Sequence, residues 1–243
     1  MKGMVAMITG ASVGIGRTVA LKLAAEGKNL VLLDINGVKL LQVQEDVKSF
    51  GCDCLVFDCD VSNEKQVNEA VSKAFEKFGK IDILVNNAAI WRNWETFMET
   101  TVEKWEKFIN VNVMGAVYCT RAVLPKMFEN KYGRIVNVAS VAGVYGNANM
   151  VAYSATKGAL IAMTKALAKE GVGQGVVVNC VSPGMVSPSE NSDIEYTQAT
   201  DMCYAGRTGS DRENADLICF LASEKNGYVV GQNIQIDGCR KRI

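Results

Sequence analysis

T-G-A-S-V-G-I-G, residues 9–16, joins an unbroken apolar run to a segment with helical spacing. The run M-V-A-M-I-T (4–9) has the continuous apolarity of a strand that is buried on both faces. Beyond the glycines, apolar side chains recur at helical spacing over residues 14–27. The stretch therefore predicts a buried strand, a tight turn and a helix, which together open a parallel sheet covered by helices.

The same alternation of short apolar runs and longer amphipathic stretches continues along the chain, and no linker or shift in composition divides it. We expect the α/β class, with a single Rossmann-type doubly wound parallel sheet of about seven strands and helices on both faces. The whole of 1–243 is then one domain. Further strands are predicted at 29–34, 54–58, 81–86, 134–140, 176–181 and 233–237, with helices at 37–49, 63–78, 102–129, 151–170 and 211–222, and a substrate-binding loop or lid at 183–210.

The composition argues against several kinds of partner. The chain has 26 basic and 26 acidic side chains, so it lacks the positive excess that binds nucleic acid or an anionic membrane surface. No apolar run reaches transmembrane length, and the segment before the first glycine-rich turn is too short for a signal peptide. We expect a cytoplasmic protein that binds neither nucleic acid nor membrane.

The sequence has no histidine and eight cysteines. Catalysis by serine with histidine, or by cysteine with histidine, is therefore excluded. Cys52, Cys54 and Cys59 lie near one another, but no histidine and no second cysteine pair accompanies them. We interpret the cysteines as free thiols in a reducing compartment and predict no metal site.

Three glycines in the first turn are suited to binding an anion. Gly10, Gly14 and Gly16 permit a tight turn and a close approach to the backbone, and the next helix directs its free N–H groups at the ligand. Similar glycines also occur in ordinary strand-to-helix turns. Their position after the first buried strand favours the pyrophosphate of a dinucleotide.

Asp34 ends the second predicted strand, where a carboxylate binds the adenosine ribose hydroxyls and repels a 2′-phosphate. NAD is therefore expected rather than NADP. Two alternatives stay open: Asp34 is also placed to cap the helix that begins near Asn36, and Arg17 offers a guanidinium to a phosphate. Val13 supports NAD, because no basic residue stands directly before the second glycine of the turn.

Tyr153 and Lys157 can do the acid–base work usually given to imidazole. They are four residues apart and lie on one face of the helix predicted over 151–170. A free tyrosine has a pKa of about 10, so the phenolate needs an adjacent ammonium and the positive nicotinamide ring to stabilise it. Ser140 ends a predicted strand at the carboxyl edge of the sheet, where its hydroxyl can hold a substrate oxygen.

Seven motifs in order resemble those of the short-chain dehydrogenase/reductase family from end to end. The resemblance implies a catalytic set in which Tyr153 is the acid/base, Ser140 orients the substrate oxygen, and Lys157 binds the nicotinamide ribose and lowers the tyrosine pKa. Asn112 would hold a water that links Lys157 to solvent. The motifs are T-G-A-S-V-G-I-G (9–16), D-V (60–61), N-N-A-A (86–89), N-V-M-G (112–115), Ser140, Y-S-A-T-K (153–157) and P-G (183–184).

The resemblance also implies which residues bind the dinucleotide. Two departures stand out: N-N-A-A replaces the commoner N-N-A-G, and Pro188 falls where the family often has a cofactor-binding threonine, so that Ser187 or Ser189 would replace it. The predicted cofactor-binding residues are Gly10, Ser12, Val13, Gly14, Ile15, Gly16, Asp34, Asp60, Val61, Asn87, Ala88, Tyr153, Lys157, Pro183, Gly184 and Val186.

The C-terminal part of the chain is most similar to the 3-oxoacyl-acyl-carrier-protein reductase type. Those reductases usually use NADPH, and many carry arginines near the ends of the two long helices, where this chain has Glu129 and Gln174. We therefore expect a NAD-dependent oxidoreductase that interconverts a secondary alcohol and a ketone on a partly hydrophobic small molecule, such as a steroid, bile acid, or cyclic or aromatic alcohol. The alternative is a 3-oxoacyl-acyl-carrier-protein reductase of fatty acid synthesis, and a remote one is a non-catalytic NAD-binding subunit.

The expected substrate pocket has an apolar and aromatic wall, although some of its residues would equally suit the core or an interface. The resemblance further implies a homotetramer, built as a dimer of dimers. The predicted pocket residues are Trp91, Trp94, Val141, Tyr145, Met150 and Met185.

Overall fold

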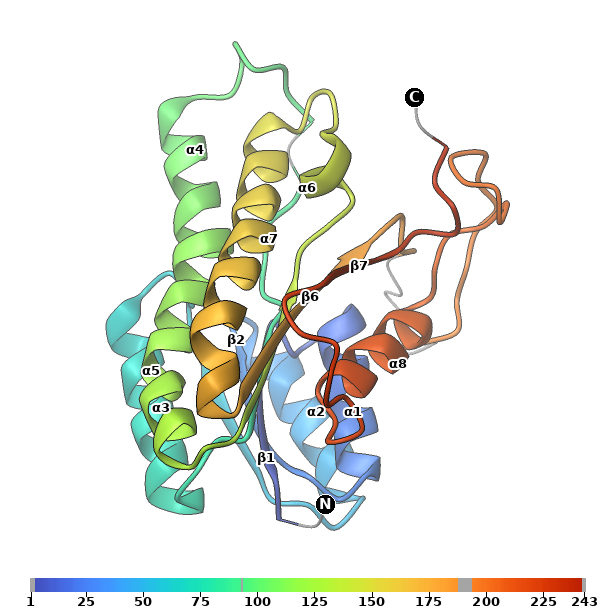
Figure 1. The fold of residues 1–243 in the computed structure, drawn as a ribbon. Coiled ribbons are helices and arrows are strands. Elements are labelled where there is room, and N and C mark those ends of the chain that lie inside the picture. The colour runs from blue at the N-terminus through green and yellow to red at the C-terminus, as the bar shows by residue number, and fades with distance from the viewer. Residues whose placement is uncertain (1–2, 93, 188–193, 242–243) are drawn as a thin grey trace.

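A parallel sheet forms the centre of the molecule (Figure 1). The structure is a computed structural model that describes residues 3–92, 94–187 and 194–241. Within these residues seven strands lie in the order β3-β2-β1-β4-β5-β6-β7, and every neighbouring pair is parallel. The predicted fold class is confirmed. The strands are β1 (Val5–Thr9), β2 (Asn29–Asp34), β3 (Cys54–Asp58), β4 (Ile83–Asn86), β5 (Gly133–Val138), β6 (Val176–Pro183) and β7 (Asn233–Ile236).

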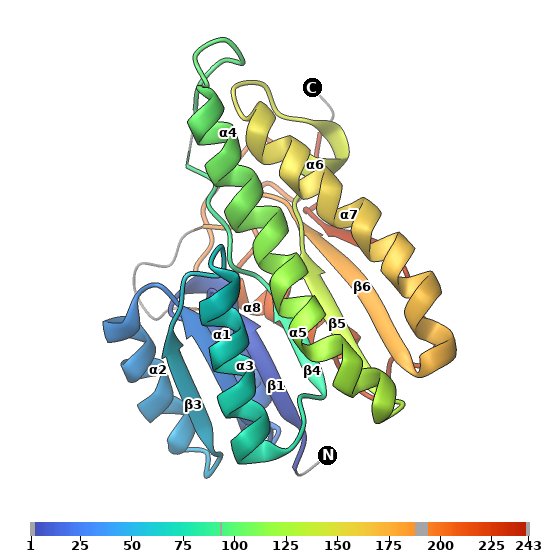
Figure 2. The same cartoon turned by 90° about the vertical axis from the view of Figure 1, so that its left-hand side faces the viewer.

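Helices cover both faces of the sheet (Figures 1 and 2). Helices α1, α2 and α8 lie on one face, and α3, α5 and α7 lie on the other. The helices are α1 (Gly14–Ala25), α2 (Gly37–Lys48), α3 (Glu64–Phe78), α4 (Val102–Ile109), α5 (Gly115–Glu129), α6 (Ala142–Tyr145), α7 (Val151–Gly171) and α8 (Asp211–Leu221), with a π-helix η1 (Asn110–Met114) and a 3-10 turn η2 (Val172–Gln174).

The core follows from the two-residue period of the strands. Ala6 and Ile8 of β1 enter the hydrophobic cluster under α1, α2 and α8, while Val5 and Met7 enter the cluster under α3, α5 and α7. Because both faces are covered, the inner strands have no solvent side, which explains their unbroken apolar sequence.

The strand order reverses direction at β1, which pairs with both β2 and β4. In an open parallel sheet the loops that leave two such strands turn to opposite faces, and ligands bind in the crevice between them at the carboxyl ends of the strands. The loops after β1 and β4 therefore border a crevice at the carboxyl edge of the sheet.

Several elements differ from the sequence-based expectation. Strand β4 begins at Ile83 rather than at 81, and β5 ends at Val138 rather than at 140. The helix predicted over 102–129 contains the π-helix η1, where the N–H of Gly115 donates to the carbonyl of Asn110, five residues earlier. Helix α6 was not predicted, because its four residues are too few to show a helical period. Strand β6 runs on to Pro183, two residues beyond its predicted end, because Pro183 still pairs with Ile236 of β7.

The described parts of the expected lid are tied to other segments. Val186 pairs with Gly209 in an isolated bridge, and Cys203 pairs with Arg240 of the C-terminal tail.

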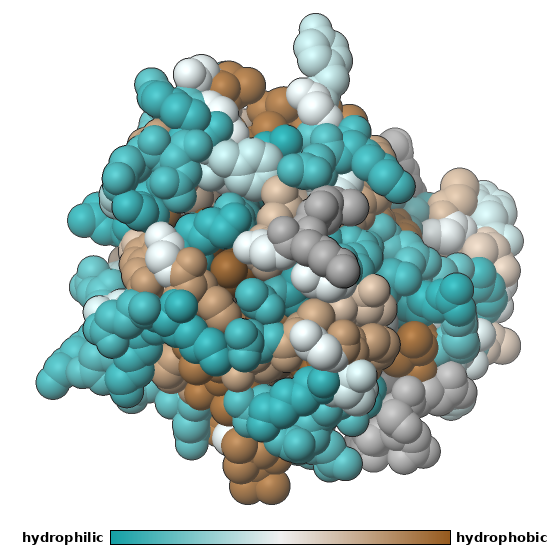
Figure 3. All heavy atoms as spheres, turned by 90° about the horizontal axis from the view of Figure 1, so that it is seen from below, coloured by the Kyte–Doolittle hydropathy of each residue, from teal (hydrophilic) through white to brown (hydrophobic). Residues whose placement is uncertain are grey.

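Among the described residues, no helix is both long and apolar enough to cross a bilayer. Seen from the end at which the strands begin, hydrophilic side chains spread between smaller hydrophobic areas (Figure 3).

Candidate active site

The turn after β1 depends on glycine for its shape. Gly10 has φ +64°, and a Cβ placed on it would lie 2.9 Å from the Cα of Ala88. A Cβ on Gly16 would lie only 2.1 Å from the carbonyl oxygen of Gly10. The turn and the first residues of α1 are therefore packed backbone against backbone, which no larger residue would permit.

Asn87 and Thr9 hold this turn against the end of β4. The Asn87 amide nitrogen Nδ2 donates to the carbonyls of Thr9 and Gly10, both at 3.0 Å. The Thr9 hydroxyl in turn accepts from the backbone N–H groups of Asn87 and Ala88, again at 3.0 Å. Sequence reasoning placed Asn87 and Ala88 along the cofactor but missed their role in building the turn.

Asp34 lies beside the same turn and joins it to β2. Its Oδ2 accepts from the backbone N–H of Ser12 at 3.0 Å, and its Oδ1 accepts from that of Asn36 at 2.9 Å. The cap of α2 is Asn36, whose side chain accepts from Lys39 N, so Asp34 is not the cap. Arg17, the residue that argued for NADP, forms an ion pair with Asp46 at 2.8 Å.

These residues fit the dinucleotide that the family implies. The N-terminus of α1 has no side-chain cap at Val13 and no acidic residue in its first turn, so its N–H groups are available to a pyrophosphate. A Cβ on Gly14, at φ +58°, would make only an ordinary contact, 3.8 Å from Oδ1 of Asp211. Ser12, Ile15 and Gly16 complete the turn, and the Asp34 carboxylate lies beside it at the end of β2.

The loop after β3 adds a second wall at this edge. Asp60 is held in a tight turn, because its Oδ1 accepts from both the N–H and the hydroxyl of Ser62. Val61 is buried against α5, and a Cβ on Gly115 would lie 2.7 Å from its Cγ2. The predicted adenine contacts therefore lie on a loop that packing fixes in place.

Ser140 and Tyr153 come together at the end of β5. Ser140 directly follows the chain's exit from the sheet, and its Oγ accepts from the N–H of Ala142 at 3.1 Å. The Ser140 side chain is also hydrogen-bonded to that of Tyr153, from the first turn of α7. A substrate oxygen placed between them would meet two hydroxyl groups.

Lys157 lies beneath Tyr153 on the same face of α7, as the four-residue spacing predicted. Its Nζ is buried, donates to the carbonyl of Val138 at 2.7 Å and lies 5.7 Å from the centre of the Tyr153 ring. Burial lowers the pKa of Lys157 to about 8. Gly143 of α6 makes this packing possible, since a Cβ there would lie 2.5 Å from the backbone of Lys157.

The pKa of Tyr153 differs from the sequence-based expectation. Burial raises the pKa of its phenol, and the hydrogen bond with Ser140 acts in the opposite direction. The expected lowering relied on the positive nicotinamide ring as well as Lys157. The protein's own groups do not supply the lowering, because desolvation is the largest influence on this side chain.

The side chain of Asn112 joins two segments of the site. Its Oδ1 accepts from the N–H of Ile90 at 2.8 Å, and its Nδ2 donates to the Ile90 carbonyl and to the Thr156 hydroxyl. The residue is fully buried, and these bonds hold the loop after β4 against α7. The predicted role of Asn112 in holding a water for Lys157 stays a prediction.

The predicted pocket residues divide into two groups. Val141 and Met150 are buried, and the N–H of Val141 donates to the carbonyl of Pro183. The other four are exposed at the same end of the molecule, and the Tyr145 hydroxyl also bonds to Gln235 of β7. These four are Trp91, Trp94, Tyr145 and Met185.

The start of the expected lid packs against β7. A Cβ on Gly184 would lie 2.8 Å from the Cα of Asp237. Val186 follows with its bridge to Gly209, and the hydroxyl of Ser187 is buried against that of Thr208 at 2.6 Å. The expected substitutes for the missing threonine thus divide: Ser187 is already bonded, while Pro188 and Ser189 lie outside the described residues.

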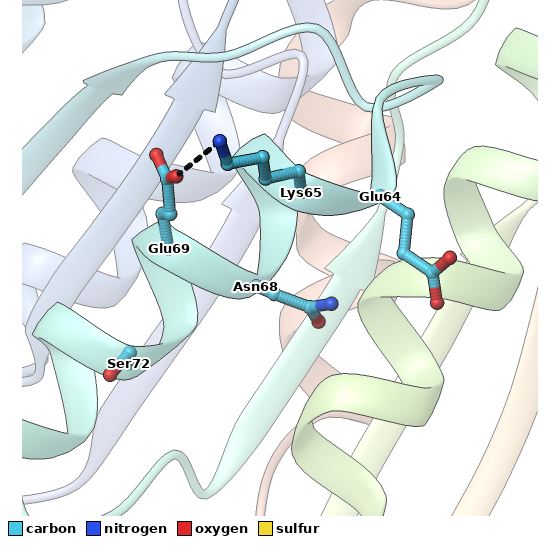
Figure 4. Close-up of a pocket in the computed structure, with 5 residues that line it drawn as sticks. All are labelled: Glu64, Lys65, Asn68, Glu69 and Ser72. Carbon is cyan, nitrogen blue, oxygen red and sulfur yellow. Dashed lines mark ion pairs between the residues drawn. The ribbon is translucent and has the colours of Figure 1, made fainter.

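One further surface hollow lies away from this site, on the solvent side of α3 (Figure 4). Its polar lining comes from one helix, and Lys65 pairs with Glu69 along it. This is the pattern of a solvated helix face. Its lining residues are Glu64, Lys65, Asn68, Glu69 and Ser72.

Seven of the eight free cysteines are buried, and Cys239 is exposed. Burial raises the pKa of Cys54 to about 12 and that of Cys59 to about 11, so neither is a thiolate near neutral pH. Among the described residues, no three cysteine, aspartate or glutamate side chains gather as metal ligands would.

Comparison with known proteins agrees with this geometry. The family model described as Enoyl-(Acyl carrier protein) reductase matches residues 10–239. The chain belongs to the short-chain dehydrogenase/reductase family and is an oxidoreductase that acts on CH–OH groups.

Named relatives cover nearly the whole chain. The chain is 38% identical over 241 residues to the 3-oxoacyl-[acyl-carrier-protein] reductase FabG of Thermotoga maritima, which covers 98% of both proteins. It is 35% identical over 245 residues to the FabG of Aquifex aeolicus, covering 98% of this chain and 97% of that protein. A crystal structure of NAD+-bound xylitol dehydrogenase superposes with a TM-score of 0.89 at 32% identity, covering 98% of each chain.

Proposed function

We propose that this protein interconverts a secondary alcohol and a ketone with NAD(H) as the cofactor. The observation that carries the proposal is the grouping of Ser140, Tyr153 and Lys157 at the carboxyl edge of the sheet, beside the glycine-rich turn. When bound, NAD supplies hydride transfer at its nicotinamide ring.

The side chains divide the proton chemistry among them. In alcohol oxidation Tyr153 takes the proton of the hydroxyl group while the hydride leaves the carbon that bears this group. In ketone reduction Tyr153 gives a proton to the carbonyl oxygen. Ser140 holds the oxygen in line with Tyr153, to which it is already hydrogen-bonded. Lys157, fixed by the Val138 carbonyl, places a positive charge near the phenol when it is protonated.

The preference for NAD over NADP rests on Asp34. Its carboxylate is held by the backbone of Ser12 and Asn36, so it cannot turn away from a ribose without losing both hydrogen bonds. A 2′-phosphate would meet this negative charge, while the guanidinium of Arg17 is already paired with Asp46. The NAD-bound relative of known structure supports the same assignment.

For the substrate we propose a 3-oxoacyl thioester first. This was the alternative in the sequence analysis, and the relatives named 3-oxoacyl-[acyl-carrier-protein] reductase support it better than a steroid-type alcohol. A free secondary alcohol is the second candidate. It is favoured by the xylitol dehydrogenase neighbour, and by Glu129, which forms an ion pair with Lys126 where many carrier-protein reductases have an arginine; Lys131 keeps its positive charge, because its hydrogen-bond partner Gln174 is neutral.

A cofactor and substrate panel followed at 340 nm tests the proposal. Acetoacetyl-CoA with NADH represents the thioester, and xylitol, cyclic secondary alcohols and hydroxysteroids with NAD represent the free alcohols. Each reaction is repeated with NADPH in place of NADH, or with NADP in place of NAD. Turnover of the thioester with NADH is expected. Turnover of free alcohols alone would select the second candidate, and activity confined to NADPH would show that Asp34 does not decide the cofactor.

A further inference from the structure

The C-terminal tail returns over the edge of the sheet that carries the proposed active site. After β7 the chain rises beside the lid toward the loop between α6 and α7 (Figures 1 and 2). Cys203 of the lid and Arg240 of the tail form a bridge, and the N–H of Lys241 donates to the carbonyl of Met202. These contacts hold the backbone of Arg240 against the lid.

Arg240 reaches the loop that precedes the proposed catalytic tyrosine. Its Nη2 donates to Oδ1 of Asn147 at 2.9 Å, across 93 positions of the sequence. The backbone N–H of Asn147 donates to the hydroxyl of Ser154, the neighbour of Tyr153 in the first turn of α7. A chain of two hydrogen bonds thus runs from the guanidinium to the helix that presents the acid/base.

The same guanidinium lines a small cavity together with residues beside the expected nicotinamide position. Gly184 and Met185, at the start of the lid, share this cavity with Arg240. Asp237 lines it as well, and its Oδ1 accepts from the N–H of Cys239 at 3.0 Å. Arg240 therefore lines the same cavity as Gly184, an expected cofactor-binding residue, and Met185, an expected pocket residue.

The charge of Arg240 is not neutralised by a carboxylate of the chain. Arg17, Arg207 and Arg212 each form an ion pair, with Asp46, Glu213 and Glu195 respectively. Within 3–92, 94–187 and 194–241, by contrast, no acidic side chain pairs with Arg240, and Asn147 is its one hydrogen-bond acceptor. A guanidinium has five N–H donors in a planar fork that matches a carboxylate or phosphate. Most of this capacity has no acceptor among the described residues.

We propose that Arg240 is a specificity-determining residue that binds an anionic group on the substrate, a carboxylate or a phosphate, while its reacting carbon lies at Ser140 and Tyr153. This inference rests on the proposed function and narrows its substrate class to ketones and alcohols that carry such a group. Met185 is half exposed and lines the same cavity as Arg240, so its side chain would contact the body of the molecule.

Two matched pairs of ketones and one substitution test this directly. Acetoacetate is compared with its neutral methyl ester, and acetoacetyl-CoA with the neutral N-acetylcysteamine thioester, each with the full-length protein and NADH. In Arg240→Gln the KM for the anionic member is expected to rise by about 10- to 100-fold, the range for a lost hydrogen bond to a charged group. The neutral members should keep their KM, and kcat should change little. A raised KM for acetoacetate would identify a carboxylate as the group bound by Arg240, and a raised KM for acetoacetyl-CoA would identify a phosphate.

Two further variants separate recognition from tail anchoring. Lys241→Gln removes the same charge from the next residue, whose Nζ lies over the Tyr204 ring at 5.4 Å, and should leave both pairs unchanged. Asn147→Ala removes the hydrogen bond but keeps the guanidinium, and should preserve the preference for the anionic members. Equal losses on neutral and anionic ketones in Arg240→Gln, or no loss on either, would overturn the inference while the proposed function stands. If the wild type turns over no ketone or alcohol with either cofactor, the proposed function itself fails and the inference with it.

Discussion

Replacing Gly16 by alanine is expected to damage both stability and cofactor binding, although Gly16 lies inside a helix. The new Cβ would be 2.1 Å from the Gly10 carbonyl oxygen, more than an ångström short of the 3.4 Å at which ordinary contact begins, and 2.6 Å from Nδ2 of Asn87. The nearest obstacle is backbone, so no flexible side chain can turn aside. The turn must open, and the hydrogen bonds from Asn87 to Thr9 and Gly10 must lengthen with it.

The magnitude can be worked out from these contacts. Overpacking of a rigid site costs about 1–3 kcal/mol, and each weakened hydrogen bond adds roughly 1 kcal/mol. The better helix propensity of alanine returns about 1 kcal/mol. The net loss should be about 2–4 kcal/mol, a large part of a typical total stability of about 5–15 kcal/mol.

Urea unfolding, together with a titration of NAD, measures both effects. Gly173→Ala is the matched control, because a Cβ there meets nothing within 4 Å and its φ lies outside the strained range. It should change the free energy of unfolding by no more than about 0.5 kcal/mol. Asn87→Ala should lower the free energy of unfolding less in the Gly16→Ala protein than in the wild type, because the new methyl group at position 16 and the Asn87 side chain compete for the same space. A Gly16→Ala protein as stable as the control, with undiminished NAD affinity, would refute the reasoning.

Three other substitutions address the site. Tyr153→Phe should lower kcat by about 10²–10⁴-fold while NAD affinity is kept, and retained turnover would remove Tyr153 from the mechanism. Asp34→Ala should raise kcat/KM for NADP relative to NAD, and an unchanged ratio would assign cofactor choice to another residue. Lys157 has a pKa of about 8 when folded and about 10.4 when unfolded, so between these values the unfolded state binds more protons. The cost of burying the charged amine is therefore present in full below about pH 8 and is lost as the pH rises. Between about pH 8 and 10.4 the free energy of unfolding of the wild type should increase by on the order of 3 kcal/mol relative to that of Lys157→Met. A difference in urea unfolding that does not change with pH would contradict this.

The fold was predictable because each inner strand is buried on both faces. Runs such as M-V-A-M-I-T and N-L-V-L-L-D lack the alternation of polar and apolar residues that a strand with a solvent-facing side would show. Strand β2 begins and ends where it was predicted. Helix α3, predicted over 63–78, begins at Glu64, where the Asn63 side chain caps it by accepting from the N–H groups of Lys65 and Gln66. Helix α6 and the π-helix were missed, because one is too short to show a period and the other depends on contacts far along the chain.

The site was predictable where spacing along one helix or strand end places the residues. Tyr153, Lys157 and Ser140 meet as their positions indicated, although their roles in catalysis stay predictions. The contacts between distant segments were not predictable. Gly143 gives no signal of its packing on Lys157, and nothing in R-K-R at the end of the sequence indicates that Arg240 reaches Asn147. The homotetramer and the cytoplasmic location also stay predictions.

The π-helix η1 has a consequence for how α4 is oriented. A turn with hydrogen bonds five residues apart holds one residue more than an α-helical turn, and each residue of an α-helix rotates the chain by about 100°. The extra residue therefore sets the angular phase of α4 relative to α5. With it, Phe108 is buried and Ile109 is half-exposed. The number of residues between the two helices, rather than the identity of any one side chain, fixes which stripe of α4 meets α7.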